Sequence, residues 1–124
     1  MPVHEVAIAQ QMIEAVVETA GRHGGGHVRV ARMLLGRLTC VDPESLTFAF
    51  EVACRGTCAQ GCRLEIQRVP LVLRCRECGD EGQREQPVDP CPRCGARGGD
   101  VLQGREIRLT TLDVDDLLPA EGVA

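Results

Sequence analysis

The segment from Val6 to Ala20 has the hydrophobic pattern of an amphipathic helix. Its apolar side chains recur three or four positions apart, and its polar side chains fall on the opposite face. Three glycines follow at Gly24 to Gly26, and glycine readily adopts the left-handed conformation that ends a helix. We therefore predict a first helix over Val6 to Ala20 that stops at the glycines.

A second helix is predicted after Asp42 and Pro43. Aspartate is a favoured N-terminal capping residue, and proline fits the first helical position. Gly56 marks the expected end of this helix. Its buried stripe is expected to contain Leu46, Ala49, Phe50 and Ala53.

Three further segments have the patterns of strands. His27 to Leu38 is rich in Val and Leu on both faces, as expected for a strand covered at least partly on each side. Cys62 to Val69 and Glu106 to Val114 alternate apolar with polar residues, which is typical of half-buried strands. The order helix, strand, helix, strand, insert, strand predicts an α+β fold with two helices on a three-stranded sheet. The tail from Asp115 to Ala124 is expected to be frayed.

Composition narrows the class of protein. The chain has 124 residues, 44% of them apolar, and a mean hydropathy of -0.07, which fits a soluble, packed chain. It has two Phe and no Trp or Tyr, so it has little with which to stack on bases. Its net charge of -4 also argues against a nucleic-acid binder, which is usually basic. No apolar run approaches the roughly 20 residues needed to cross a bilayer, so we expect no membrane association.

Eight cysteines in so short a chain require an explanation. The beginning of the sequence lacks the basic and apolar regions of a signal peptide, so we expect a cytoplasmic protein. In that reducing compartment, paired cysteines bind metal more often than they form disulfides.

Four of the cysteines form two C-x2-C knuckles, each followed directly by glycine. The knuckles contain Cys75 and Cys78, then Cys91 and Cys94. Four thiolates at this spacing predict a closed, tetrahedral zinc site, which is structural because no ligand position stays open. Between the knuckles, Val88 is the one aliphatic side chain, so this stretch cannot fold by burial alone. Zinc binding, at about 10 to 16 kcal/mol for such sites, is sufficient to order it.

Other interpretations of the insert remain open at this point. The cysteines could form two disulfides, or the chain could be an iron–sulfur or thiol redox module. A zinc ribbon could also be a nucleic-acid or protein adaptor. The insert carries five arginines and five acidic residues from 71 to 99, and zinc with four thiolates adds two negative charges, so its charge does not favour nucleic acid.

Several sequence features together resemble the HypA/HybF family of hydrogenase maturation nickel chaperones. They are His4-Glu5 before the first helix, the run from Cys40 to Phe50, Gly56-Thr57, Gly61, Leu64-Glu65-Ile66 and the two knuckles. The resemblance covers nearly the whole chain. It implies a two-part protein, which we expect to divide into a nickel domain at 1–70 plus 104–124 and a zinc ribbon at 71–103.

The resemblance implies that this chain is a metallochaperone rather than an enzyme. It would take up Ni2+ as a cargo at His4 and Glu5 and keep Zn2+ as a structural ion. It would pass nickel onward with a maturation GTPase to the hydrogenase large subunit, and in some organisms serve urease as well. No nucleophile with an adjacent base or phosphate-binding glycine loop stands out in the sequence.

The N-terminus departs from the family pattern, in which Met-His-Glu comes first and nickel is held by the terminal amine, backbone amides and the histidine ring. Here Pro2 and Val3 precede His4, and proline has no amide N–H to ionise. Two routes restore a four-nitrogen set suited to square-planar Ni(II). Either Met1 is removed to leave Pro-Val-His, or the native product starts at position 3 and begins Met-His-Glu. The second route is the favoured hypothesis.

The remaining cysteines and histidines are expected to have no metal role. Cys40 and the group Cys54, Cys58 and Cys62 are predicted to be packed or inert thiols. Because the last three are spaced by four, a second soft-metal site there remains an alternative. His23 and His27, which flank the triple glycine, are expected to be exposed turn residues.

Overall fold

The computed structural model describes residues 2–115 and divides them into two compact units. Within the described residues, unit 1 contains 2–33, 41–66 and 109–115, and unit 2 contains 34–40 and 67–108. The predicted tail lies outside the described residues from position 116 onward. The functional division at 1–70 plus 104–124 and 71–103 remains a prediction.

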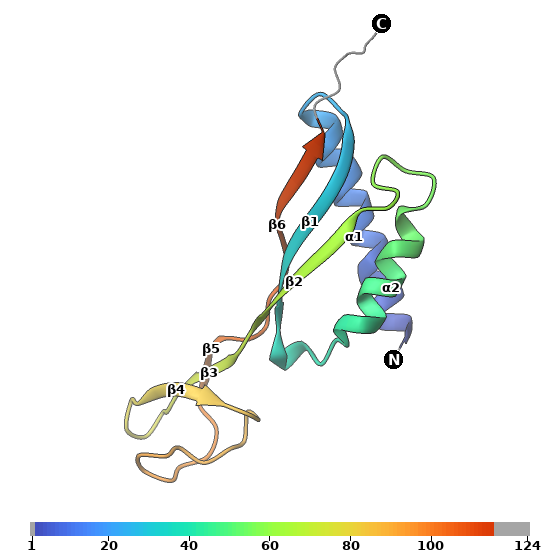
Figure 1. The fold of residues 1–124 in the computed structure, drawn as a ribbon. Helices are drawn as coiled ribbons and strands as arrows, with labels where there is room; N and C mark the ends of the chain where they lie inside the picture. The colour runs from blue at the N-terminus through green and yellow to red at the C-terminus, as the bar shows by residue number, and fades with distance from the viewer. Residues whose placement is uncertain (1, 116–124) are drawn as a thin grey trace, which may run out of the picture. The chain divides into compact units, whose positions relative to one another are not determined.

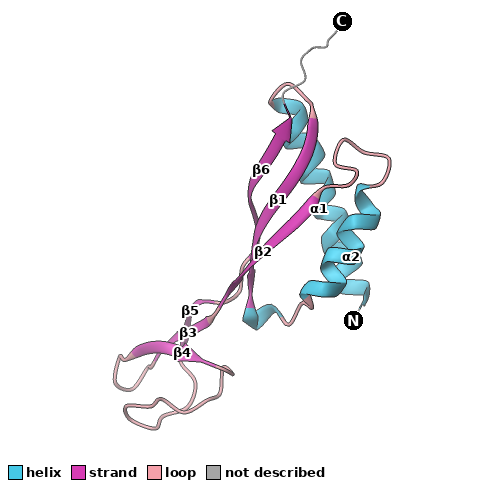
Figure 2. Cartoon of the chain, in the orientation of Figure 1, coloured by secondary structure: helices cyan, strands magenta, loops and turns pink. Residues whose placement is uncertain are grey.

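Two helices and two three-stranded sheets make up the fold (Figures 1 and 2). One sheet has the strand order β2-β1-β6, and both helices lie on one side of it (Figure 1). The other sheet has the order β4-β3-β5, with β3 antiparallel to both neighbours. The elements are α1 (Pro2–Arg22), β1 (His27–Gly36), a short 3-10 helix (Arg37–Thr39), α2 (Pro43–Cys54), β2 (Arg63–Val69), β3 (Leu71–Arg74), β4 (Glu81–Arg84), β5 (Asp100–Gln103) and β6 (Ile107–Asp115).

The predicted α+β fold with two helices and a three-stranded sheet is confirmed. The first strand is shorter than predicted, because the chain turns into the 3-10 helix after Gly36. Strands β3, β4 and β5 were not predicted, since each has only four residues. They belong to the cysteine-rich insert.

The helix ends follow the predicted chemistry. Asp42 caps α2, because its Oδ2 accepts hydrogen bonds from the Ser45 backbone N–H at 3.0 Å and the Ser45 hydroxyl at 2.7 Å. Helix α1 begins earlier than predicted and ends where the Gly25 N–H donates to the Ala20 carbonyl at 2.8 Å. Among the described helices, neither is long and apolar enough to cross a membrane.

Unit 1 has an aliphatic core between the helices and the sheet. Leu46 and Phe50 of the predicted α2 stripe are fully buried, whereas Ala49 and Ala53 are half-buried. Strand β1 buries residues on both faces, as predicted from its composition. Within unit 1, the other buried apolar residues of these elements are Ala9, Met12, Ile13, Val16, Ala20, Val28, Val30, Ala31, Met33 and Cys54.

An arginine on β1 joins all three strands of the first sheet. Arg32 donates from Nε to Glu65 on β2 at 2.8 Å, and two of its nitrogens donate to the Asp113 carboxylate on β6 at 2.9 Å each. The hydrogen bonds from Arg63 and Arg32 hold the pKa of Glu65 below its usual value, and Arg32 lowers the pKa of Asp113. This network links the three strands through their side chains.

Two glycines in unit 2 allow the backbone to approach itself closely. The Gly36 N–H donates to the Glu106 carbonyl at 2.7 Å, and the Leu38 N–H donates to the Gly104 carbonyl at 2.9 Å. A Cβ atom added at Gly36 would overlap the Gly104 carbonyl, which is backbone and cannot rotate away. A side chain at position 36 therefore requires a backbone shift.

We predict that Gly36→Ala lowers the free energy of unfolding by about 1 to 3 kcal/mol, as overpacking in a tight site does. Gly21→Ala is the matched control, because Gly21 lies in α1 with nothing within 4 Å of its added Cβ. The control should raise stability by about 1 kcal/mol through helix propensity. Urea unfolding followed by circular dichroism measures both, and equal stability of the two variants would contradict the close approach.

Candidate metal centre

The structure brings the four cysteines of the two knuckles into one cluster in unit 2. The sulfur atoms of Cys75, Cys78, Cys91 and Cys94 all lie within 4.8 Å of one another. The Cys75 and Cys94 sulfurs are 3.5 Å apart, and the Cys78 and Cys91 sulfurs are 3.7 Å apart. This arrangement can hold one metal ion with four thiolate ligands.

The backbone folds each knuckle in the same way. The Gly79 N–H donates to the Cys75 carbonyl at 2.9 Å, and the Cys75 N–H donates to the Asp80 carbonyl at 2.8 Å. Both bonds recur at the equivalent positions around Cys91, each at 2.7 Å. Gly79 and Gly95 have φ angles of 80° and 82°, a left-handed conformation that favours glycine. The glycine after each C-x2-C pair is thus required by the turn.

The four knuckle thiols differ in how readily they ionise. Backbone N–H groups of Cys94 and Arg93 lower the pKa of the Cys91 thiol to about 7. The Ala96 amide lowers the pKa of Cys94, but the adjacent Cys75 sulfur and burial outweigh it and raise that pKa to about 12. Hydrogen bonds from the backbone N–H groups of Cys78 and Glu77 also lower the pKa of Cys75, so Cys75 and Cys91 ionise more readily than Cys94. A divalent cation offsets two of the four thiolate charges and so favours ionisation of all four sulfurs.

Little apolar surface is buried around the cluster. Leu71 and Leu73 of β3 are buried, as are the ligand side chains of Cys75 and Cys91. Val88, the one aliphatic residue between the knuckles, is 64% exposed. We therefore expect the metal ligands, rather than apolar side chains, to hold this region together.

The two residues predicted for nickel lie in the first turn of α1, in unit 1. His4 is exposed, whereas Glu5 is only 2% exposed. The Glu5 carboxylate accepts a hydrogen bond from the Asp42 backbone N–H at 3.1 Å. Glu5 thus ties the start of α1 to the start of α2. The sequence placed Glu5 just before the predicted first helix and did not reveal this contact, because Asp42 is far away in the sequence.

The other cysteines differ in their surroundings. Cys54 and Cys62 are buried, as predicted, and Cys58 is half-buried. Burial, with smaller contributions from Cys62 and Cys58, raises the pKa of Cys54 to about 12, so this thiol is inert. Cys40 was predicted to be a packed or inert thiol, and it is not packed: it is exposed, at the end of the 3-10 helix with a φ of 60°. Cys40 lies in a turn at the surface, so its side chain does not pack into the core.

A second metal site at Cys54, Cys58 and Cys62 gains no support. Among residues 2–115, the knuckle cysteines are the only group of three or more ligand side chains gathered closely enough for one ion. His23 and His27 are exposed, as predicted, and each contacts a backbone carbonyl, of Thr19 at 2.9 Å and of Gln60 at 2.8 Å.

We predict that Cys75→Ser removes bound metal and unfolds the knuckle region, because three sulfurs cannot close the site. Helices α1 and α2 should persist, since their core lies in unit 1. Cys40→Ser is the control, because Cys40 is exposed and lies outside the cluster. Metal content by elemental analysis and amide NMR spectra test this, and full metal occupancy in Cys75→Ser would contradict it.

Comparison with known proteins identifies the family. Residues 3–114 match the family described as "Hydrogenase/urease nickel incorporation, metallochaperone, hypA". The "Hydrogenase maturation factor HypA" of Geotalea uraniireducens is 39% identical over 112 residues, covering 90% of this chain and 99% of the relative. The protein of the same name from Cereibacter sphaeroides is also 39% identical, over 113 residues, covering 90% and 98%.

Solved structures show the same fold at lower identity. The solution structure of the Ni metallochaperone HypA from Helicobacter pylori superposes with a TM-score of 0.64 at 20% identity, covering 89% of this chain and 96% of that one. A second structure, titled "Solution structure of HypA protein", gives a TM-score of 0.66 at 21% identity, covering 90% and 96%. Together with the family match over residues 3–114, these likenesses show that the chain belongs to the HypA family of nickel metallochaperones.

Proposed function

We propose that this protein binds Ni(II) at the start of α1 and delivers it during maturation of a [NiFe] hydrogenase. The observation that carries the proposal is the exposed His4 in the first helical turn of a chain whose family incorporates nickel. Exposure allows ligands to exchange, which a carrier of nickel requires. Delivery to urease is a second outcome that the family description allows.

Backbone geometry at the helix start supports a nitrogen chelate. The first four N–H groups of an α-helix have no carbonyl partner within that helix, so backbone amides that follow the terminal amine in this turn can ionise without breaking a helical hydrogen bond. The positive end of the helix dipole also favours the resulting negative charge. With the terminal amine and the His4 ring, these amides provide four nitrogen donors for square-planar Ni(II).

The true N-terminus decides which nitrogens take part. Pro2 interrupts the chelate if Met1 is retained, so either Met1 is removed or the product begins at position 3. The family match that starts at Val3 favours the second route. The intact mass of the natively produced protein distinguishes the two.

Glu5 acts in this scheme as a positioning residue. Its buried carboxylate accepts the Asp42 backbone N–H, which anchors the first turn of α1 against α2. The neighbouring His4 remains exposed on that anchored turn. A fixed backbone lowers the entropy that the chelate loses when nickel binds.

We assign Zn2+ to the four-cysteine cluster and a structural role to that ion. The donor set fits, because four thiolates with no open position are typical of structural zinc. This assignment separates a permanent ion in unit 2 from a removable one in unit 1. Handover would go to a maturation GTPase and the hydrogenase large subunit, in the cytoplasm, and we propose no enzymatic activity for the chain.

We predict that His4→Ala weakens nickel binding by more than about 100-fold. Loss of a residue that hydrogen-bonds to a metal ligand already lowers metal affinity by about 10- to 100-fold, and loss of the ligand itself should cost more. Zinc content should stay unchanged. His23→Ala is the matched control, because His23 is also an exposed histidine and lies in the turn directly after α1. Nickel titration by calorimetry, with elemental analysis of zinc, tests this. Unchanged nickel affinity in His4→Ala would refute the proposed site.

Nickel affinity should also depend steeply on pH. Protons compete with the metal for amine, amide and imidazole nitrogens, so affinity is expected to fall as pH decreases from about 8 to 6. Zinc in the thiolate cluster should persist over most of that range. Titrations at several pH values measure both metals, and a nickel affinity independent of pH would exclude a nitrogen-donor site.

A further inference from the structure

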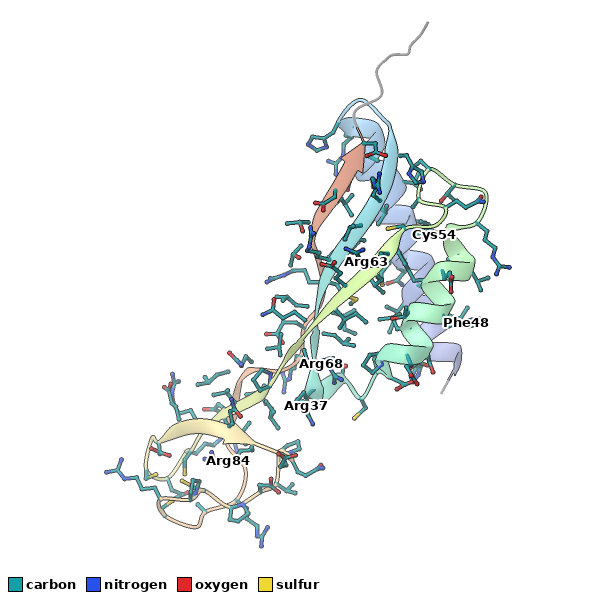
Figure 3. All side chains as sticks on the ribbon, in the orientation of Figure 1. Arg37, Phe48, Cys54, Arg63, Arg68 and Arg84 are labelled. Carbon is teal, nitrogen blue, oxygen red and sulfur yellow. The ribbon has the colours of Figure 1, made fainter. Side chains whose placement is uncertain are left out.

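Helix α2 presents one of the two phenylalanines of the chain to solvent. Phe50 is fully buried, whereas Phe48 is 65% exposed. Val52 on the same helix is 42% exposed, and Val6 on α1 is 50% exposed. Figure 3 labels Phe48 on α2. An exposed aromatic side chain with exposed aliphatic neighbours marks a candidate interaction surface.

A groove between α1 and α2 runs beside Phe48, entirely within unit 1. Its volume is about 480 Å³, and its apolar lining comes from Val6, Phe48, Ala49, Val52 and Ala53. On the other side of Phe48, a hollow of about 400 Å³ is lined by Leu64 and Ile66 of β2. Phe48 is therefore a ridge between two depressions, a shape that an interdigitating helix can match.

Acidic residues border the apolar surface. Glu44 and Glu51 lie one helical turn before and after Phe48, and both line the depressions beside it. Glu44 also lines the groove together with Asp42. In sequence, unit 1 as a whole contains eleven Asp and Glu residues against five Arg. The partner that complements this surface carries apolar anchors flanked by Lys or Arg.

We propose that the groove between α1 and α2 docks an amphipathic, basic helix of a partner protein. An apolar helix face supplies anchors every three or four residues, which suit a groove between two helices. A second copy of this chain fits poorly, because a symmetric contact would bring Glu44 and Glu51 close to the same acidic residues of the copy.

The groove also adjoins the proposed nickel site. Glu5 and Val6, which follow His4 in the first turn of α1, both line it. A helix docked there would lie beside the nickel ligands, where it could bring an accepting protein to the metal. This last link rests on the proposed function, whereas the docking itself does not require nickel.

Two synthetic helical peptides of about 18 residues test the proposal, one built from Leu and Lys and the other with Glu in place of Lys. The Leu/Lys peptide should bind to the zinc-loaded protein, with amide NMR shifts at residues 5–10 and 42–53. The Leu/Glu peptide should bind at least about tenfold more weakly. Shifts concentrated elsewhere, or no binding of the Leu/Lys peptide, would overturn the proposal.

Matched variants test which residues contribute to binding of the Leu/Lys peptide. Phe48→Ser should weaken the Leu/Lys peptide at least about tenfold, as loss of an aromatic anchor does. Val88→Ser should leave it unchanged, because Val88 has nearly the same exposure, 64%, but lies in unit 2. The double variant Glu44→Gln, Glu51→Gln should weaken it mainly at low salt. Equal binding by wild type and Phe48→Ser would contradict the assigned surface.

Two further measurements separate the alternatives. If sedimentation shows a dimer of the wild type that Phe48→Ser dissociates, the occupant is a second copy and the proposal fails. Nickel titration of Phe48→Ser should match the wild type. If the peptide binds as expected but His4→Ala retains nickel, the docking surface stands and the proposed nickel site falls.

Discussion

Unit 2 depends on the placement of four sulfur atoms within 4.8 Å of one another. Backbone N–H groups lower the pKa of the Cys91 thiol, whereas neighbouring sulfurs and burial raise that of Cys94. A cation bound among the sulfurs would favour ionisation of all four ligands. The surrounding chain has little else to hold it, since Val88 is exposed and β4 is polar. Metal binding and folding of this unit are therefore expected to be coupled.

Unit 1 is built on a different physical basis. Aliphatic burial between two helices and a sheet stabilises it, and the contact between Glu5 and Asp42 holds the starts of both helices together. His4 stays outside this core and remains exposed. The proposed function thus pairs a closed sulfur site in unit 2, suited to a permanent ion, with an open nitrogen site at His4, suited to an ion that must leave.

Features with a strong local signal were predictable from sequence. The helices, the capping residue Asp42 and the pairing of the knuckle cysteines each follow from spacing or turn chemistry. Strand β4 was not predictable, because its polar residues become a strand only by pairing with β3. The burial of Glu5 and the exposure of Cys40 also depend on tertiary context, which residue type alone does not reveal.

The central claim is that a metal ion organises unit 2 while unit 1 folds on its own apolar core. Hydrogen exchange measured by mass spectrometry on zinc-loaded and chelator-stripped protein tests it most directly. We predict that stripping abolishes protection in β3, β4 and β5 and in both knuckles, and leaves it intact in α1 and α2. Loss of protection in the helices, or unchanged protection in the knuckles, would contradict the account.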